Sequence, residues 1–423
     1  MRLCAGRGPA SGLSGRQVHR DLPAVTVDPP GDGLSVWLLA FGQTLTYAGL
    51  YYGFAALLPA LEADFGWTKA ELAAGPTLAF LVTAVLTPFT GGLVDRGRAG
   101  EMLTLLPLLG GAAMAGMALA QTQAQWLALW ALVGVAQAGA MYETCFAFLT
   151  RRLGQGARAA ITRVTLVAGF AGTLAFPFGA ALAAVVGGRG GLVGFAVLVA
   201  LGVAPVNLWA VVRLRRRSPA ARRRADPEPG AMAAALRRPA FWGLAAVWGL
   251  IWLNHTILIT YALELFTSRG AASGVAVVAA SCIGPAQVSG RLLLMLNEAR
   301  VGNARATMFA LVSILVASVC LAAAGVALPL IFAFALCQGM GAGLLSILKP
   351  VLTADLLGRR GFGAVSGALA VAPILSSAAG PSVGAALLAA GGTAAVLSAS
   401  FAMAVAGTAI AAVLLARGQR DLA

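Results

Sequence analysis

The chain alternates between long apolar stretches and short polar segments. Twelve apolar stretches occur, six on each side of one long polar interruption. They fall near 34–60, 72–94, 102–120, 126–149, 160–184 and 191–213, and then near 240–264, 272–296, 306–326, 328–352, 364–388 and 393–416. Because a transmembrane helix needs roughly 20 mostly apolar residues, this pattern predicts an all-α membrane protein with twelve transmembrane helices.

The composition agrees with a membrane protein. Hydrophobic residues make up 59% of the 423 positions and charged residues 11%, whereas soluble domains carry roughly 25% charged residues. The net charge of +15 could suggest a nucleic-acid partner, but such a partner needs a basic face on a folded domain. Here the arginines flank apolar stretches or lie in one linker, so we expect the lipid bilayer as a partner and no nucleic acid.

Basic residues predict the orientation in the membrane. The interruption at 213–238 contains nine arginines, and the loops on its side of the membrane hold 18 basic residues in all. The loops on the other side hold three, which are Lys69, Arg189 and Arg269. Basic loops stay cytoplasmic, so we expect a multi-pass protein of the plasma (inner) membrane with both termini in the cytoplasm.

The two groups of six stretches repeat with an offset of about 204 residues. Trp37 and Trp242 each open the first stretch of a group, and Pro177 and Pro381 each lie late in the fifth. Parallel repeats of this kind pack around a midplane site in some transporters. We therefore predict a disordered cytoplasmic tail at 1–33, a six-helix bundle at 34–213, a basic linker at 214–239, a second six-helix bundle at 240–416 and a short tail at 417–423.

Residues 91–98, GGLVDRGR, resemble the signature that major facilitator superfamily transporters carry between their second and third helices. Gly91, Asp95 and Arg96 match that signature, whereas the residues after Gly97 depart from it. The resemblance implies the major facilitator fold of two pseudo-symmetric bundles. It also implies that Asp95, with Arg96 and Gly91, forms a conformational gate rather than a cargo site.

A narrower resemblance is to the monocarboxylate and oxalate–formate carriers. The stretch EADFGWTKAEL at 62–72 looks like the first external loop of that branch, and GRLLL at 290–294 places Arg291 where those carriers have an arginine for substrate anions. The sequence departs from the branch at Gln287, where animal monocarboxylate carriers have an aspartate, and it lacks their lysine in the first helix.

Two ionisable side chains lie deep in the predicted bilayer. At 1.5 Å per residue, Glu143 lies roughly 16 Å and Lys349 roughly 14 Å from the cytoplasmic end of its helix. An ionisable group at this depth is costly and indicates function. Glu143 and Lys349 could instead form a structural salt bridge, and both readings stay open.

Further polar residues share helix faces with this predicted site. Gln287 and Arg291 lie on one face of the eighth helix, although Arg291 could also snorkel to the cytoplasmic surface. The remaining candidates for lining the cavity, which could also serve only in helix packing, are Gln338 in the tenth helix and Gln43, Tyr47 and Tyr51 in the first.

These residues predict a secondary transporter that works by alternating access. Arg291 and Lys349 favour a small organic anion such as a carboxylate, because an unpaired buried charge is expensive. Glu143 is the candidate for proton coupling, because desolvation makes proton uptake by a carboxylate easier. An efflux pump for amphipathic drugs is the alternative within transport, and a non-transporting sensor is the alternative of another class.

Other activities are not expected from the residues present. The chain has two histidines and five cysteines without CxxC spacing, which predicts no metal site and no cofactor. An enzyme would need a catalytic constellation such as paired carboxylates, which the apolar stretches lack. The segments outside the predicted helices are too short for the folded extension that a sensor usually carries, and we expect a monomer.

Overall fold

The computed structural model describes residues 33–153, 157–217, 231–297, 301–358 and 362–420. Nearly all of the predicted N-terminal tail (1–33), half of the predicted linker (214–239) and part of the predicted C-terminal tail (417–423) lie outside these residues. All regular secondary structure of the described residues is helical. The prediction of an all-α membrane fold is therefore confirmed.

The first half of the chain forms six crossings. The first crossing contains a π-helical segment, the fourth is interrupted by one residue, and the fifth and sixth follow each other with only a kink between them. The elements are α1 (Gly33–Tyr47), η1 (Ala48–Tyr52), α2 (Gly53–Phe65), α3 (Lys69–Asp95), α4 (Ala99–Met117), α5 (Gln123–Ala140), α6 (Tyr142–Leu153), α7 (Ala157–Ala168), α8 (Ala171–Val197), η3 (Leu198–Val203) and α9 (Ala204–Arg217).

The second half repeats this arrangement. A short helix precedes its first crossing, another follows it, and the last two crossings form one kinked helix. The elements are α10 (Ala231–Leu236), α11 (Pro239–Thr260), α12 (Ala262–Thr267), α13 (Ser273–Asn297), α14 (Asn303–Ala323), α15 (Leu330–Leu357) and α16 (Phe362–Arg420).

Twelve crossings follow from the helix lengths. Nine helical stretches of the described residues are long and apolar enough to cross a membrane. Two of them, of 58 and 53 residues, are each long enough to cross twice, and each turns back at a glycine kink, Gly187 in one and Gly391–Gly392 in the other. The stretch Gly33–Phe65, divided by η1, supplies the remaining crossing.

Backbone geometry supports the predicted repeat. Gly66 and Gly270, 204 residues apart, both have positive φ in the turn after the first crossing of a half. Gly187 (φ 71°, ψ −174°) and Gly392 (φ 59°, ψ −156°) have nearly the same conformation between the fifth and sixth crossings. Only glycine adopts this region readily, so the two halves use the same device to reverse direction.

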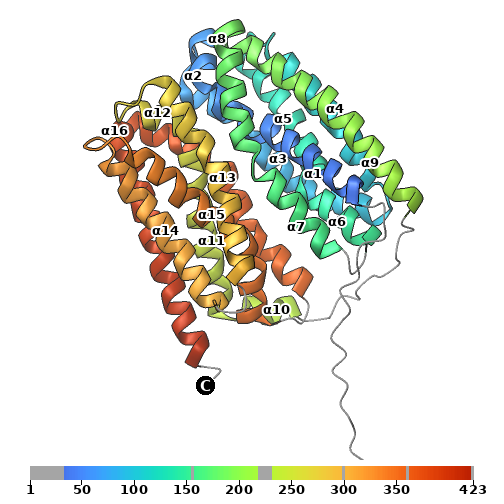
Figure 1. The fold of residues 1–423 in the computed structure, drawn as a ribbon, viewed down its shortest axis with the longest axis vertical. Coiled ribbons are helices and arrows are strands. Elements are labelled where there is room, and N and C mark those ends of the chain that lie inside the picture. The colour runs from blue at the N-terminus through green and yellow to red at the C-terminus, as the bar shows by residue number, and fades with distance from the viewer. Residues whose placement is uncertain (1–32, 154–156, 218–230, 298–300, 359–361, 421–423) are drawn as a thin grey trace, which may run out of the picture.

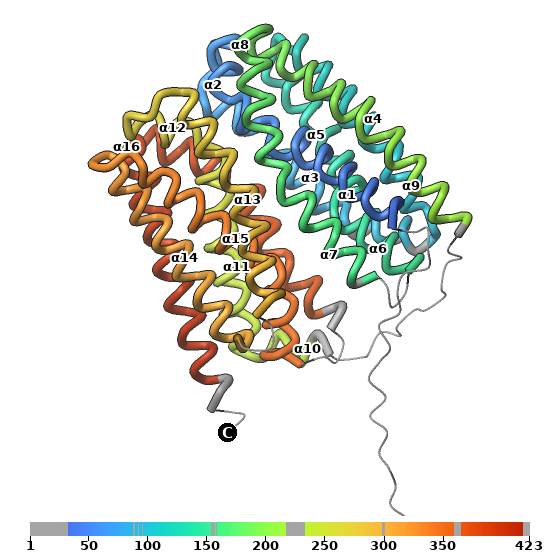
Figure 2. Tube along the Cα trace, viewed as in Figure 1, coloured from blue at the N-terminus to red at the C-terminus, as the bar shows by residue number. Residues whose placement is uncertain are grey.

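The helices of the two halves gather in two groups that lie side by side (Figures 1 and 2). We call the end where α9 ends and α10 begins the linker end, and the opposite end, with α12 and the turn after α2, the far end. One apolar core joins the halves, because it contains Phe54 and Phe195 as well as Ile257 and Phe266. At the linker end each half has a core of its own.

Replacing Gly392 with alanine tests the kink. The backbone conformation there is strained for any residue with a Cβ, although nothing lies within 4 Å of the added atom. We expect the variant to lose about 1–3 kcal/mol of unfolding free energy, measured by thermal or denaturant unfolding in detergent. Gly274→Ala, in the first turn of α13 with open space around it, is the control and should be neutral or slightly stabilising. Equal stability of the two variants would contradict the conformational argument.

Candidate functional site

A cavity of about 380 Å³ lies between the two halves. Its wall on one side comes from η1 and the helices around it (α1, α3, α5, α6 and α7), and on the other side from α11, α13, α15 and α16. Six of the residues predicted from the sequence line it together, namely Tyr47, Tyr51, Glu143, Gln287, Arg291 and Lys349. Segments far apart in the chain therefore meet at one place.

A break in the fourth crossing carries Tyr142 and Glu143 to the cavity. Met141 has an extended backbone (φ −88°, ψ −170°) between α5 and α6. Tyr142 and Glu143 follow in the first turn of α6 and both line the cavity, where Glu143 is exposed. The N-terminus of a helix favours negative charge nearby, so the break gives the carboxylate of Glu143 a favourable place.

The π-helical segment η1 brings more residues of the first crossing to the cavity than regular helical spacing predicts. A π turn inserts an extra residue and changes the register of a helix. Tyr47, Tyr51 and also Tyr52, which the sequence analysis did not single out, line the cavity. Tyr52 was not predicted because regular helical spacing places adjacent residues such as Tyr51 and Tyr52 on different parts of the helix surface. Their adjacency was the one feature of the sequence that could have indicated a π turn.

Two glutamines support these helix distortions. The side-chain Nε2 of Gln43 donates to the carbonyl of Ala140, beside the break, at 2.9 Å. Nε2 of Gln137 donates to the carbonyl of Leu50, within η1, at 2.7 Å. Gln43 is fully buried and does not line the cavity, which corrects its predicted placement. Gln137 does line it, although it was not among the residues predicted from the sequence.

Gln338 also lies outside the cavity lining. It is fully buried, and its Nε2 lies 3.2 Å from Oδ1 of Asn254 and 3.3 Å from Nδ1 of His255. This contact joins α15 to α11, so the predicted placement of Gln338 is corrected in the same way. A polar side chain in an apolar helix needs a partner inside the protein, and here the partner is a neighbouring helix.

The second wall carries both cations. Nζ of Lys349 lies 5.4 Å from the centroid of the Trp252 ring. Arg291 is 5% exposed and, rather than reaching the surface, donates from Nη1 to the carbonyl of Thr165 in α7 and from Nε to that of Gly343 at 3.4 Å. Among the ion pairs of the described residues, none joins either cation to Glu143.

The predicted gate lies at the linker end of α3. Gly91 and Arg96 are exposed, and α3 ends at Asp95, whose side chain lies outside the described part of the structure. Nη1 of Arg151 donates to the carbonyl of Val94 at 2.6 Å, which ties α6 to this turn. The gating role of Asp95, Arg96 and Gly91 stays a prediction.

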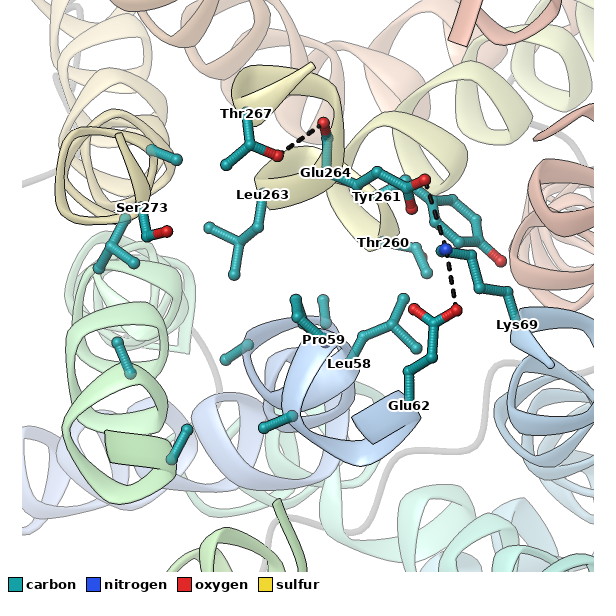
Figure 3. A pocket seen from close by; sticks show the side chains of 17 residues that line it. Leu58, Pro59, Glu62, Lys69, Thr260, Tyr261, Leu263, Glu264, Thr267 and Ser273 are labelled. Carbon is teal, nitrogen blue, oxygen red and sulfur yellow. Dashed lines mark hydrogen bonds and ion pairs between the residues drawn. The ribbon is translucent and has the colours of Figure 1, made fainter. Parts of the chain in front are cut away.

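An ionic contact links the halves at the far end (Figure 3). Nζ of Lys69 lies 3.0 Å from Oε1 of Glu62, in its own half, and 3.5 Å from Oε1 of Glu264, in the other. A second cavity of about 530 Å³ adjoins these three residues. Burial raises the pKa of Glu264, and the charge of Lys69 opposes that shift. No pattern in the sequence predicted this contact.

The fold and the cavity between two six-helix halves define a membrane transporter of the two-bundle class. The chain belongs to the Major Facilitator Superfamily, whose family profile matches residues 39–327. No curated protein matches the chain. The specific branch suggested by the sequence stays a prediction.

Solved transporters share the fold. A bacterial homolog of the human lysosomal transporter Spinster, in an inward-facing and occupied conformation, is 16% identical with a TM-score of 0.66, covering 93% of this chain and 98% of the other. The nucleoside transporter NupG is 12% identical with a TM-score of 0.68, covering 91% and 98%. At these identities the likeness concerns the fold.

The raised pKa of Glu264 predicts that the far-end contact weakens in mild acid. This carboxyl takes up a proton at a higher pH than an ordinary glutamate, and a neutral Glu264 no longer attracts Lys69, which then keeps its ion pair with Glu62. Tyr261 also lies near Glu264. Spin labels at Ala63 and Ala272, exposed on opposite halves, should move apart as the pH falls from about 8 to about 5. Glu264→Gln, the control, should give one distance distribution at both pH values, and a pH-independent wild type would contradict the prediction.

Proposed function

We propose that the protein carries a small organic anion across the membrane by alternating access. The observation that carries the proposal is the pair of cations on one wall of the central cavity. Lys349 is half-buried against Trp252 and Arg291 is almost fully buried, and no ion pair among the described residues joins either to Glu143. Uncompensated charge in a low-dielectric site is costly, so an anionic cargo would supply the missing countercharge.

The arrangement of the apolar cores supports a state open toward the linker end. The halves share a core that reaches the far end and have separate cores at the linker end. The cavity-lining residues Glu143 of α6 and Ser346 of α15 are exposed, and so are Thr150 and Pro350, which lie nearer the linker end of the same two helices. With the basic linker in the cytoplasm, this state is inward-open and both termini are cytoplasmic.

Glu143 is our candidate for proton coupling. It faces the same cavity as Lys349, and the two charges act on one another. When an anionic cargo pairs with Lys349, Glu143 loses part of the field that stabilises its charge, and binding a proton would remove the charge that is left uncompensated. Cargo binding and proton uptake would then favour each other.

Efflux of amphipathic compounds remains the second candidate. Aromatic side chains make up much of the wall formed by the first half, and Glu143 is the only carboxylate among the lining residues that the structure describes. Such a wall also accepts lipophilic cations. Uptake of radiolabelled monocarboxylates into proteoliposomes, compared with export of a lipophilic cation, separates the two functions.

Removing the charge of Lys349 should weaken anion binding. A hydrogen bond to a charged group contributes about 1.5–3 kcal/mol, so we expect Lys349→Gln to raise the dissociation constant of a transported carboxylate by about tenfold or more. Lys349→Arg, which keeps the charge, should stay within about threefold of wild type. Arg305→Gln, which removes an exposed basic residue outside the cavity, is the control. Unchanged affinity in Lys349→Gln would remove the main support for an anionic cargo.

Neutralising Glu143 should separate transport from its driving force. In Glu143→Gln, accumulation driven by a pH gradient should disappear, whereas exchange of cargo at equal concentrations should persist, because the cationic wall is intact. Both rates are measured in proteoliposomes with the same radiolabelled carboxylate. Proton-driven uptake at the wild-type level would exclude Glu143 from coupling, and loss of folding would mark it as structural.

A further inference from the structure

The tyrosines of this protein are concentrated at the central cavity. The chain contains five tyrosines, and four of them line the cavity, namely Tyr47, Tyr51, Tyr52 and Tyr142. All four belong to the first half, where they sit on two separate crossings that the π segment and the break at Met141 distort. Two phenylalanines of the same half, Phe80 and Phe146, also line it.

These rings form one continuous surface. Tyr142 stacks on Phe146, with centroids 4.9 Å apart and planes at 14°, and lies 4.3 Å from the Tyr47 ring. Tyr47 lies 5.9 Å from Tyr51, which contacts Phe80 edge-on at 5.6 Å. All five of these rings are half-buried. Each therefore packs on its neighbours and still presents part of its surface to the cavity. We call this surface the aromatic wall.

The opposite wall has different chemistry. It belongs to the second half and carries Lys349, with Trp252 beneath its ammonium group, and the buried guanidinium of Arg291. The single carboxylate among the described lining residues, Glu143, follows Tyr142 in the chain and so lies on the aromatic side. An anionic group on the cargo is therefore repelled from the aromatic wall and attracted to the other.

Two simpler cargoes suit this division less well. A short aliphatic acid would use the cations but leave the ring faces without a matching partner, and aromatic pairs gain stabilisation beyond that of buried area alone. A lipophilic cation would suit the rings, but Lys349 and Arg291 would repel it across the cavity. The volume of about 380 Å³ lies at the lower end of the range for small-molecule sites, which is enough for a ligand with one or two rings.

We infer that the cargo is an aromatic organic anion, which lays its ring against the aromatic wall and directs its charged group to Lys349 and Arg291. This inference rests on the proposed function, since it specifies the class of anion carried at the same site. It also gives the two halves separate tasks: the first half recognises the ring and the second recognises the charge.

Matched pairs of acids test the inference. Benzoate and cyclohexanecarboxylate, and likewise 2-naphthoate and decahydro-2-naphthoate, have the same charge and carbon skeleton but differ in aromaticity. Dissociation constants are measured with the purified full-length protein by ligand-induced thermal stabilisation. We expect the aromatic member of each pair to bind about threefold to tenfold more tightly.

Variants of the aromatic wall locate the preference. Tyr142→Leu and Tyr51→Leu should each reduce the aromatic-to-aliphatic ratio while the saturated acids keep their affinity. Trp37→Leu, at a residue 51% exposed outside the cavity, is the control and should keep the wild-type ratio. If one tyrosine variant fails to fold, the other variant and the wild-type ratio still decide the question.

The outcomes distinguish failure of the aromatic inference from failure of the organic-anion proposal. Binding of both members of each pair with equal affinity would overturn the aromatic inference and leave the organic-anion proposal standing. Binding of benzylammonium without binding of any of the four acids would overturn the proposed function itself. A wild-type preference that survives in both tyrosine variants would overturn the assignment of the ring to the aromatic wall.

Discussion

Backbone hydrogen bonding in a nonpolar solvent is the constraint on which this structure depends. In hydrocarbon, each backbone polar group must find its partner within the protein, and a regular helix meets this demand by itself. The cavity wall departs from regular helix at η1 and at Met141, so carbonyls there need other donors. Gln137 and Gln43 supply amide donors from neighbouring crossings. These two amides therefore stabilise the distortions that bring tyrosines and Glu143 to the cavity.

Polar side chains between the halves are also hydrogen bonded within the protein. Oγ1 of Thr77 in α3 lies 2.7 Å from Oγ of Ser382 in α16, and Oγ1 of Thr173 in α8 donates to the carbonyl of Ser281 in α13 at 2.8 Å. Small hydroxyl side chains let helix backbones approach closely and hydrogen bond across the interface. Each such contact is weak, about 0.6 kcal/mol on average in a membrane protein. In the proposed alternating-access mechanism, weak contacts of this kind break and re-form as the halves move.

Arg291 connects the cargo site to this interface. It lines the central cavity, and its guanidinium also donates to the carbonyl of Thr165 in the other half. In the proposed mechanism, an anionic cargo that attracts this guanidinium competes with a contact between the halves. In this proposal, binding at the cavity acts on a contact between the halves, and a ligand shifts a conformational equilibrium only by binding one conformation more tightly than another.

Hydrophobicity along the sequence determined the twelve crossings and the two-half architecture, because the bilayer demands long apolar helices whatever surrounds them. Glu143 and Lys349 could be predicted as cavity residues for a related reason: a charge at that depth is tolerated only where protein or water surrounds it. Tertiary structure alone decided the roles of the neutral polar residues. Gln43 and Gln137 carry the same side chain, and each donates to a carbonyl of another crossing, but only Gln137 also lines the cavity. Glu264 meets Lys69 because the two halves come together. Those roles depend on which helix lies opposite and on local departures from regular helix, and periodicity within one segment contains neither.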